Sequence, residues 1–199
     1  VVPTKKILSL GNVKMNTNWN EGKDDDTSWE VGHFLNLATH CNPTILETFL
    51  APYAELADPD KPHEFNTKDL RWGQTVRDLF PYIWNSKDVM NAFVGYGLNQ
   101  RKKFFDNKDN RASKYAVAYL RTLYQAWELL TTGTFTIRIV DTEIGEILRR
   151  WKIMTPEQIR EVSGEVIERC LFWEKKVKES YEKNPNKETD IPRINELLL

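Results

Sequence analysis

The chain has 199 residues, of which 40% are hydrophobic and 29% are charged, so it can bury a core and is not typical of a disordered chain. Its formal net charge of -1 excludes a global basic field for nucleic acid, so any such contact must rest on a local patch. The sequence has no apolar run of about 18 residues, the length that predicts a membrane span, and no visible secretory signal. We therefore expect a cytoplasmic protein. Cys41 and Cys170 fit no metal-ligand spacing, and we interpret both as buried thiols in a reducing compartment.

The first third of the chain predicts loops and two helices. Residues 1–28 combine a short apolar start with a polar loop rich in Asn, Asp and Gly. Apolar residues recur at helical spacing from Trp29 to Cys41, and any of the three residues before Trp29 would cap that helix. Asn42 and Pro43 predict a second helix, because Asn is a favoured N-cap and Pro costs nothing at the first helical position. Residues 51–66 predict a loop.

The remaining residues predict a helical bundle with one short strand. Helical patterns cover about 67–80, 87–105 and 112–132, and the last of these ends at Gly133. The segment TFTIRIV at 134–140 alternates and is β-branched, which predicts a strand. Asp141 or Thr142 would cap a helix to about Trp151. The sequence TPEQ at 155–158 is typical of a capping box that begins a last long helix, to about Lys183.

Four acids lie at the end of the polar loop and the start of the first helix: Asp24, Asp25, Asp26 and Glu30. Acids near a helix N-terminus are favoured by the helix dipole, so capping and solvation explain them without any chemistry. The alternative is a carboxylate that holds a metal for phosphoryl or nucleotidyl transfer, which needs several carboxylates that converge from different strands. The residues alone leave both explanations open.

A second candidate group lies in the helix predicted over 112–132. Lys114 and Arg121 are seven residues apart, two helical turns, so they share one face. Tyr115 and Tyr119 lie near that stripe, and cations with aromatic residues between them can hold a triphosphate and stack a base. The alternative is the solvated face of an amphipathic helix. The three histidines show no metal-ligand spacing, and the sequence has no P-loop, GxGxxG or GxSxG motif.

Two longer stretches resemble a known family. The first is DTSWEVGHFLNLATHCNPTILETFLAP at 26–52, and the second is SKYAVAYLRTLYQAWELLTTGTFTIRI at 113–139. They are similar to motifs of a predicted nucleotidyltransferase family of bacteria and phages, in the DNA-polymerase-β superfamily and linked to RNA repair. The matching positions are Asp26, Glu30, Phe34, Leu37, Ala38, Asn42, Pro43, Leu46, Glu47, Lys114, Ala116, Arg121, Leu123, Leu129, Leu130 and Gly133. The closing IPRINELLL also resembles the family's terminal segment.

The resemblance implies transfer of a nucleoside monophosphate from an NTP to a hydroxyl acceptor, with RNA as the expected acceptor. In this superfamily three carboxylates on a sheet hold two Mg²⁺ ions, which align the nucleophile with the α-phosphate. The resemblance implies Asp26 as the third carboxylate, both catalytic and metal-binding, with Glu30 as the second choice. It also implies that Lys114 and Arg121 contact the triphosphate. The resemblance suggests that Glu47 helps to brace that carboxylate. The alternative is that Glu47 is simply an ion-paired or capping acid.

Two features depart from the family pattern. The family carries a Gly-Ser turn and an Asp-x-Asp pair before its GVxxxPT strand, whereas this sequence starts at VVPT. We therefore expect residues 1–199 to be inactive alone, unless a missing segment or a second chain supplies those metal ligands. The second departure is Tyr119, where the family pattern has histidine; a tyrosine can still stack or donate a hydrogen bond to the nucleotide.

These observations predict a mostly helical α+β fold. Residues 1–66 would form the remainder of a nucleotidyltransferase sheet with its helices, and residues 67–199 a C-terminal helical bundle. One alternative is a non-catalytic helical module that binds RNA or a protein partner on the same scaffold. Another is a purely structural phage component. The first hypothesis requires Mg²⁺ and an NTP, whereas salt-dependent RNA binding without any effect of NTP would favour the second.

Overall fold

The computed structural model describes residues 16–18, 27–29, 31–51, 74–106, 108, 110–139 and 141–198. Strands β1 (Asn16–Asn18) and β2 (Thr27–Trp29) pair antiparallel, with Asn16 opposite Trp29. Among these residues the helices are α2 (Val31–Thr39), α3 (Pro43–Leu50), α5 (Phe80–Ile83), α6 (Ser86–Asp106), α7 (Ala112–Thr132), α8 (Glu143–Lys152), α9 (Pro156–Glu161), α10 (Ser163–Lys183) and α11 (Ile191–Leu198), and a further helical turn covers 74–78.

The predicted α+β fold with the remainder of a nucleotidyltransferase sheet is wrong for the part of the chain that the structure describes. There, the only strands are the two three-residue strands of the β1–β2 ribbon. A two-stranded ribbon of this length cannot form the layer against which helices pack, and the described core is built from helices instead. The boundary proposed near residue 66 lies outside the described residues, so the division into 1–66 and 67–199 stays a prediction.

Capping residues set the helix ends where the sequence predicted them. The Asn42 side chain accepts hydrogen bonds from the backbone N–H groups of Thr44 and Ile45 at the start of α3. Thr155 and Gln158 form the reciprocal capping box that begins α9. Gly133 has φ 83, the left-handed conformation that glycine adopts without strain, and it ends α7.

Three predicted elements differ in the structure. The helix expected from Trp29 begins at Val31, because residues 27–29 pair with β1. The last long helix breaks at Val162 into α9 and α10. The strand expected over 134–140 is wrong for its described residues 134–139. Phe135 and Ile139 are buried as the alternation required, but the backbone N–H of Thr136 donates to the Glu128 carboxylate rather than to a neighbouring strand.

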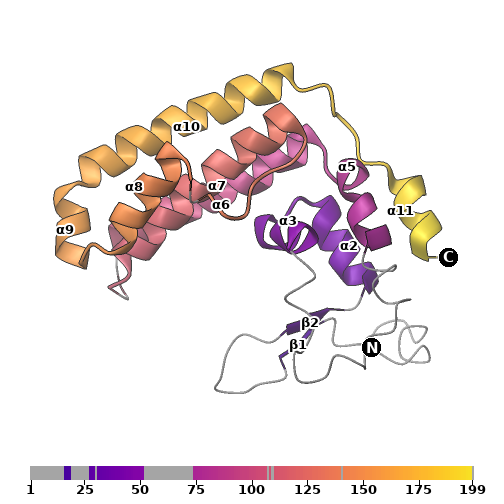
Figure 1. Ribbon diagram of the computed structural model, residues 1–199, viewed down its shortest axis with the longest axis horizontal. Helices are drawn as coiled ribbons and strands as arrows, with labels where there is room; N and C mark the ends of the chain where they lie inside the picture. The colour runs from indigo at the N-terminus through magenta and orange to yellow at the C-terminus, as the bar shows by residue number, and fades with distance from the viewer. Residues whose placement is uncertain are drawn as a thin grey trace.

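The long helices α6, α7 and α10 form the centre of the described fold, and the shorter helices pack around them (Figure 1). Helix α7 packs against both α6 and α10, and the arch of α10 runs above it in Figure 1. At one end α8 and α9 close a core around Trp151, Leu120 and Ile147. At the other end α2, α3, α5 and α11 close a second core around Phe49 and Phe93. The described residues after residue 74 are therefore mainly helical, as the helical patterns predicted.

The segment after α10 returns to the region between α5 and α6. The Ser86 backbone N–H donates to the Asn186 carbonyl, and the Asp190 backbone N–H donates to the Tyr82 carbonyl. These bonds place α11 beside α5, as Figure 1 shows. In the part of the chain that is described, no helix combines the length and the hydropathy needed to cross a membrane.

Candidate functional site

The predicted catalytic residues Asp26 and Glu30 lie outside the described residues, so their roles stay predictions. The described residues contain no group of three His, Cys, Asp or Glu side chains that could hold a metal ion. The site that can be built from the structure therefore rests on helix α7, which carries the predicted nucleotide-binding residues Lys114, Tyr119 and Arg121.

The two stretches that carry the family motifs meet at an ion pair. The Arg121 guanidinium on α7 lies 3.0 Å from Glu47 Oε1 on α3. The same Glu47 oxygen accepts a hydrogen bond of 3.0 Å from Gln125 Nε2, one turn further along α7. Gln125 is buried, whereas the Arg121 side chain remains 42% exposed. Glu47 is therefore an ion-paired acid, one of the alternatives that the sequence left open, and the pair holds Arg121 at the surface.

The segment after α7 packs beside this ion pair. Gln125 Nε2 also approaches the Thr136 carbonyl at 3.5 Å. Glu128, one turn after Gln125, accepts hydrogen bonds from the Thr136 backbone N–H at 2.7 Å and from its hydroxyl at 2.9 Å. Helix α3, helix α7 and residues 134–139 therefore form one connected polar network around Arg121.

Lys114 and Tyr119 have different environments. Lys114 is exposed in the first turn of α7, about 10 Å before Arg121 along the helix axis. Tyr119 is 1% exposed, and its hydroxyl donates to Glu174 of α10. Burial and then the hydrogen bond to Glu174 raise the pKa of Tyr119 far above its ordinary value. Its phenol thus contacts α10 in this structure, and a contact between Tyr119 and a nucleotide stays a prediction.

The sequence did not predict a cluster of aromatic side chains between α7 and α10. The Trp173 ring lies 5.1 Å from the rings of both Tyr124 and Trp127, centroid to centroid. Phe172, 54% exposed, packs edge-on against Trp173 at 5.5 Å. Arg121, Tyr124 and Trp127 are spaced at three residues on α7, so helical spacing with Arg121 was the signal that could have found them.

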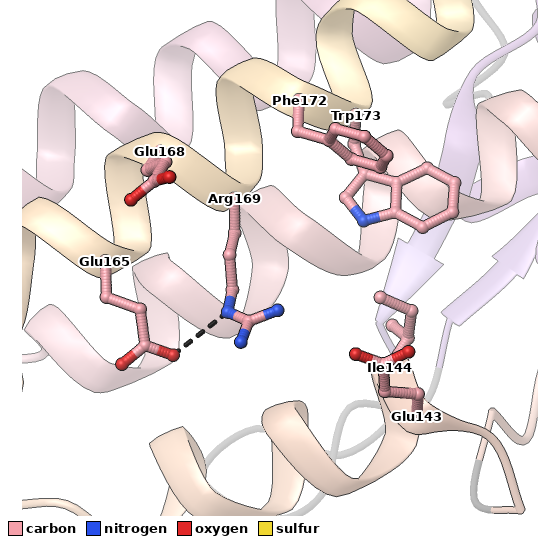
Figure 2. Close-up of a pocket in the computed structure, with 7 residues that line it drawn as sticks. All are labelled: Glu143, Ile144, Glu165, Glu168, Arg169, Phe172 and Trp173. Atoms are coloured by element: carbon pink, nitrogen blue, oxygen red, sulfur yellow. Dashed lines mark hydrogen bonds and ion pairs between the residues drawn. The ribbon is translucent and has the colours of Figure 1, made fainter.

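A cavity of about 420 Å³ opens beside this aromatic cluster, lined by Glu143, Ile144, Glu165, Glu168, Arg169, Phe172 and Trp173. Five of the lining residues come from one face of α10, and two come from the first turn of α8 (Figure 2). Thr142 caps that turn by accepting a hydrogen bond from the Gly145 backbone N–H. None of these lining residues was predicted to be functional.

The two cysteines are buried, as predicted. Burial raises the pKa of Cys41 to about 12 and raises that of Cys170 as well. A thiol with a raised pKa carries little thiolate at neutral pH. Neither cysteine is therefore suited to act as a nucleophile.

A comparison with protein families matches residues 3–199 to the RlaP family, described as the RNA repair pathway DNA polymerase beta family. The chain belongs to this family. No curated protein and no solved structure matches the chain. The match confirms the resemblance drawn from the two motif stretches, and it covers both partners of the Glu47–Arg121 ion pair.

Proposed function

We propose that the chain takes part in the transfer of a nucleoside monophosphate from an NTP to a hydroxyl of RNA. Membership of the RNA repair pathway DNA polymerase beta family supports this activity. The observation that assigns this activity to particular residues is the Glu47–Arg121 ion pair. It joins the two motif stretches and leaves the Arg121 guanidinium half-exposed.

Arg121 is the residue proposed to bind the triphosphate. A guanidinium has five N–H donors in a planar fork, so a contact with one carboxylate oxygen leaves donors for phosphate oxygens. Glu47 restricts where that fork points, since it is itself held by the buried Gln125. Lys114, two turns earlier on the same face of α7, would add a second positive charge toward the phosphates.

The two Mg²⁺ ions and their candidate ligands, Asp26 and Glu30, stay part of the proposal. The described residues offer no ligand set for such ions, so no role described here for α7 depends on a metal. A second chain or a further segment that completes the site is proposed on the family resemblance alone.

The test is a transfer assay with an α-labelled NTP, Mg²⁺ and a short RNA acceptor, with a 3′-deoxy RNA as the negative acceptor. Arg121→Ala should lower kcat/KM by about 10- to 100-fold, the usual cost of losing a hydrogen bond to a charged group. Arg160→Ala is the matched control, because Arg160 is an exposed arginine on α9. Equal rates for the two variants would contradict the assignment of Arg121. Absence of transfer by the full-length native protein would contradict the activity.

The aromatic cluster favours a second candidate, an RNA-binding module that does not catalyse transfer. Half-exposed aromatic side chains with arginines beside them can stack bases of single-stranded RNA, and Tyr124, Trp173 and Arg169 provide such a surface. This candidate predicts RNA binding that weakens with salt and does not change when NTP is added. Coupling between NTP and RNA binding would instead support the transferase.

A further inference from the structure

We propose that the cavity between α8 and α10 is a subsite for a nucleobase, stacked on the Trp173 indole and bonded at its edge by the Arg169 guanidinium. The inference deepens the proposed function and rests on it for the source of the base. The volume of about 420 Å³ lies in the range of small-ligand pockets, roughly 300–1,000 Å³.

Arg169 presents hydrogen-bond donors to the cavity in a fixed direction. Its Nε donates to Glu165 Oε1 at 2.9 Å, and Arg150 of α8 contacts the same Glu165 oxygen. Figure 2 shows the guanidinium tip pointing into the space between α10 and α8, away from Glu165. A guanidinium held through Nε keeps its outer N–H groups for acceptors, such as the ring nitrogens and carbonyl oxygens of a base.

Trp173, one turn after Arg169 on α10, gives the cavity an aromatic wall that other side chains support from behind. Trp173 packs on Tyr124 and Trp127 of α7 at 5.1 Å, so its indole cannot turn away easily. Figure 2 shows the indole facing the same space as Arg169, with Ile144 and Glu143 on the α8 side. Phe172, 54% exposed, lies at the rim. A flat ring that enters would contact apolar surface on one face and polar groups at its edge.

The charges at the cavity favour a neutral ring. The cavity is lined by three carboxylates, those of Glu143, Glu165 and Glu168, and by one guanidinium, that of Arg169. A second guanidinium, that of Arg150, is paired with Glu165. A phosphate would meet a surplus of negative charge, and a cation would meet the Arg169 tip in the opening. A base is neutral and carries both N–H donors and acceptors, so a carboxylate and a guanidinium can bind it together.

The position of the cavity suits a nucleotide whose phosphates lie elsewhere. Tyr124, which supports Trp173, is three residues after Arg121 on α7 and therefore lies beside it on the helix. A nucleotide with its base in the cavity could thus direct phosphates toward the cationic face of α7. The base could come from the incoming NTP or from the RNA acceptor, and kinetics can separate the two sources.

The experiment measures binding of the four ribonucleoside monophosphates to the full-length protein, with ribose 5-phosphate as the base-free probe. The readouts are calorimetry and the ¹⁹F resonance of 5-fluorotryptophan at position 173, assigned with Trp173→Phe. The variants are Phe172→Ala, Arg169→Gln and, as matched controls, Leu171→Ala and Arg160→Gln. Leu171 is 46% exposed on the same helix and does not line the cavity.

We expect at least one monophosphate to bind and to shift the Trp173 resonance, while ribose 5-phosphate does not shift it. Arg169→Gln and Phe172→Ala should each weaken that binding by about tenfold, and the controls should not. Binding of spermidine or agmatine with no monophosphate binding would overturn the proposal. So would equal affinities for Arg169→Gln and Arg160→Gln.

Transfer kinetics distinguish this inference from the proposed function. If the base belongs to the NTP, Arg169→Gln raises KM for the NTP, and if it belongs to the acceptor, KM for RNA rises. Monophosphate binding at Trp173 in a protein without transfer activity would contradict the proposed function and leave the subsite intact. Normal transfer with unchanged KM values in both pocket variants would overturn the subsite alone.

Discussion

Glu47 forms an ion pair with Arg121 and accepts a hydrogen bond from Gln125, and these two side chains of α7 differ in burial. Arg121 is half-exposed, and an ion pair at such a position contributes only about 0–1 kcal/mol. Gln125 is 1% exposed, and a buried amide that loses its acceptor costs about 1–3 kcal/mol. The importance of Glu47 for stability therefore comes mainly from Gln125, and its importance for the proposed binding comes from Arg121.

This difference gives a testable prediction. Glu47→Ala should lower the free energy of unfolding by about 1–3 kcal/mol, whereas Glu47→Gln, which keeps an acceptor for Gln125, should lower it by less than about 1 kcal/mol. Urea unfolding followed by circular dichroism measures both. Equal losses for the two variants would show that the ion pair, and not the amide hydrogen bond, carries the stability.

Tyr119 predicts a pH dependence at the alkaline end. Burial and the bond to Glu174 raise its pKa in the folded state, whereas in the unfolded chain a tyrosine titrates near about 10. Below about pH 10 both states hold the proton, so the stability that Tyr119 contributes is fully present. Above it the unfolded chain releases the proton first, and stability falls.

Tyr119→Phe should lower the free energy of unfolding by about 1–2 kcal/mol at pH 8, since Glu174 loses its donor. Between about pH 9 and 11 the variant should lose less stability than the native protein does. Parallel losses in the two proteins over that range would show that the Tyr119 phenol titrates normally in the fold.

At the scale of helices, the contact between α6 and α7 depends on the absence of a side chain at Gly97. A Cβ at Gly97 would lie 3.1 Å from Cδ2 and 3.3 Å from Cε2 of Tyr119, tighter than ordinary contact. Gly95 lies on the same helix and is exposed, and a Cβ there meets nothing within 4 Å. The two glycines therefore form a matched pair.

Gly97→Ala should destabilise the protein by about 1–3 kcal/mol through overpacking. Gly95→Ala should stabilise it by roughly 0.5–1 kcal/mol, because alanine is the better helix former. Thermal unfolding of the two variants checks the sign of each change. A stabilised Gly97→Ala variant would mean that α6 and α7 pack less closely than the structure has them.

Local chemistry explains why some elements could be predicted and others could not. Asn42, Thr155 and Gly133 act within one turn of their own helix, so their roles were visible in the sequence. The segment 134–139 has the alternation of a strand, but a strand needs a partner that no local pattern specifies. In the structure the backbone N–H and the hydroxyl of Thr136 donate instead to the Glu128 carboxylate of α7, a contact that only the fold reveals.

At the scale of the whole molecule, the family resemblance identified Glu47 and Arg121 as motif residues, and the structure shows that they touch. The predicted nucleotidyltransferase sheet was wrong for the described residues, because family motifs specify shared residues and not the strands around them. The cavity beside Trp173 could not be predicted, since it depends on how the first turn of α8 meets one face of α10. The residue pattern within one helix does not specify how two helices pack against each other.

The central claim is that the Glu47–Arg121 pair presents a guanidinium to a triphosphate. The most direct measurement is calorimetric binding of a non-hydrolysable NTP to the native protein, Arg121→Ala, Arg160→Ala and the double variant Glu47→Arg/Arg121→Glu. The swap can restore an ion pair between α3 and α7 but moves the cation to α3. We predict that binding weakens by about 10- to 100-fold in Arg121→Ala and in the swapped variant, and is unchanged in Arg160→Ala. Native affinity in Arg121→Ala, or its full recovery in the swapped variant, would contradict the claim and leave the ion pair a purely structural contact.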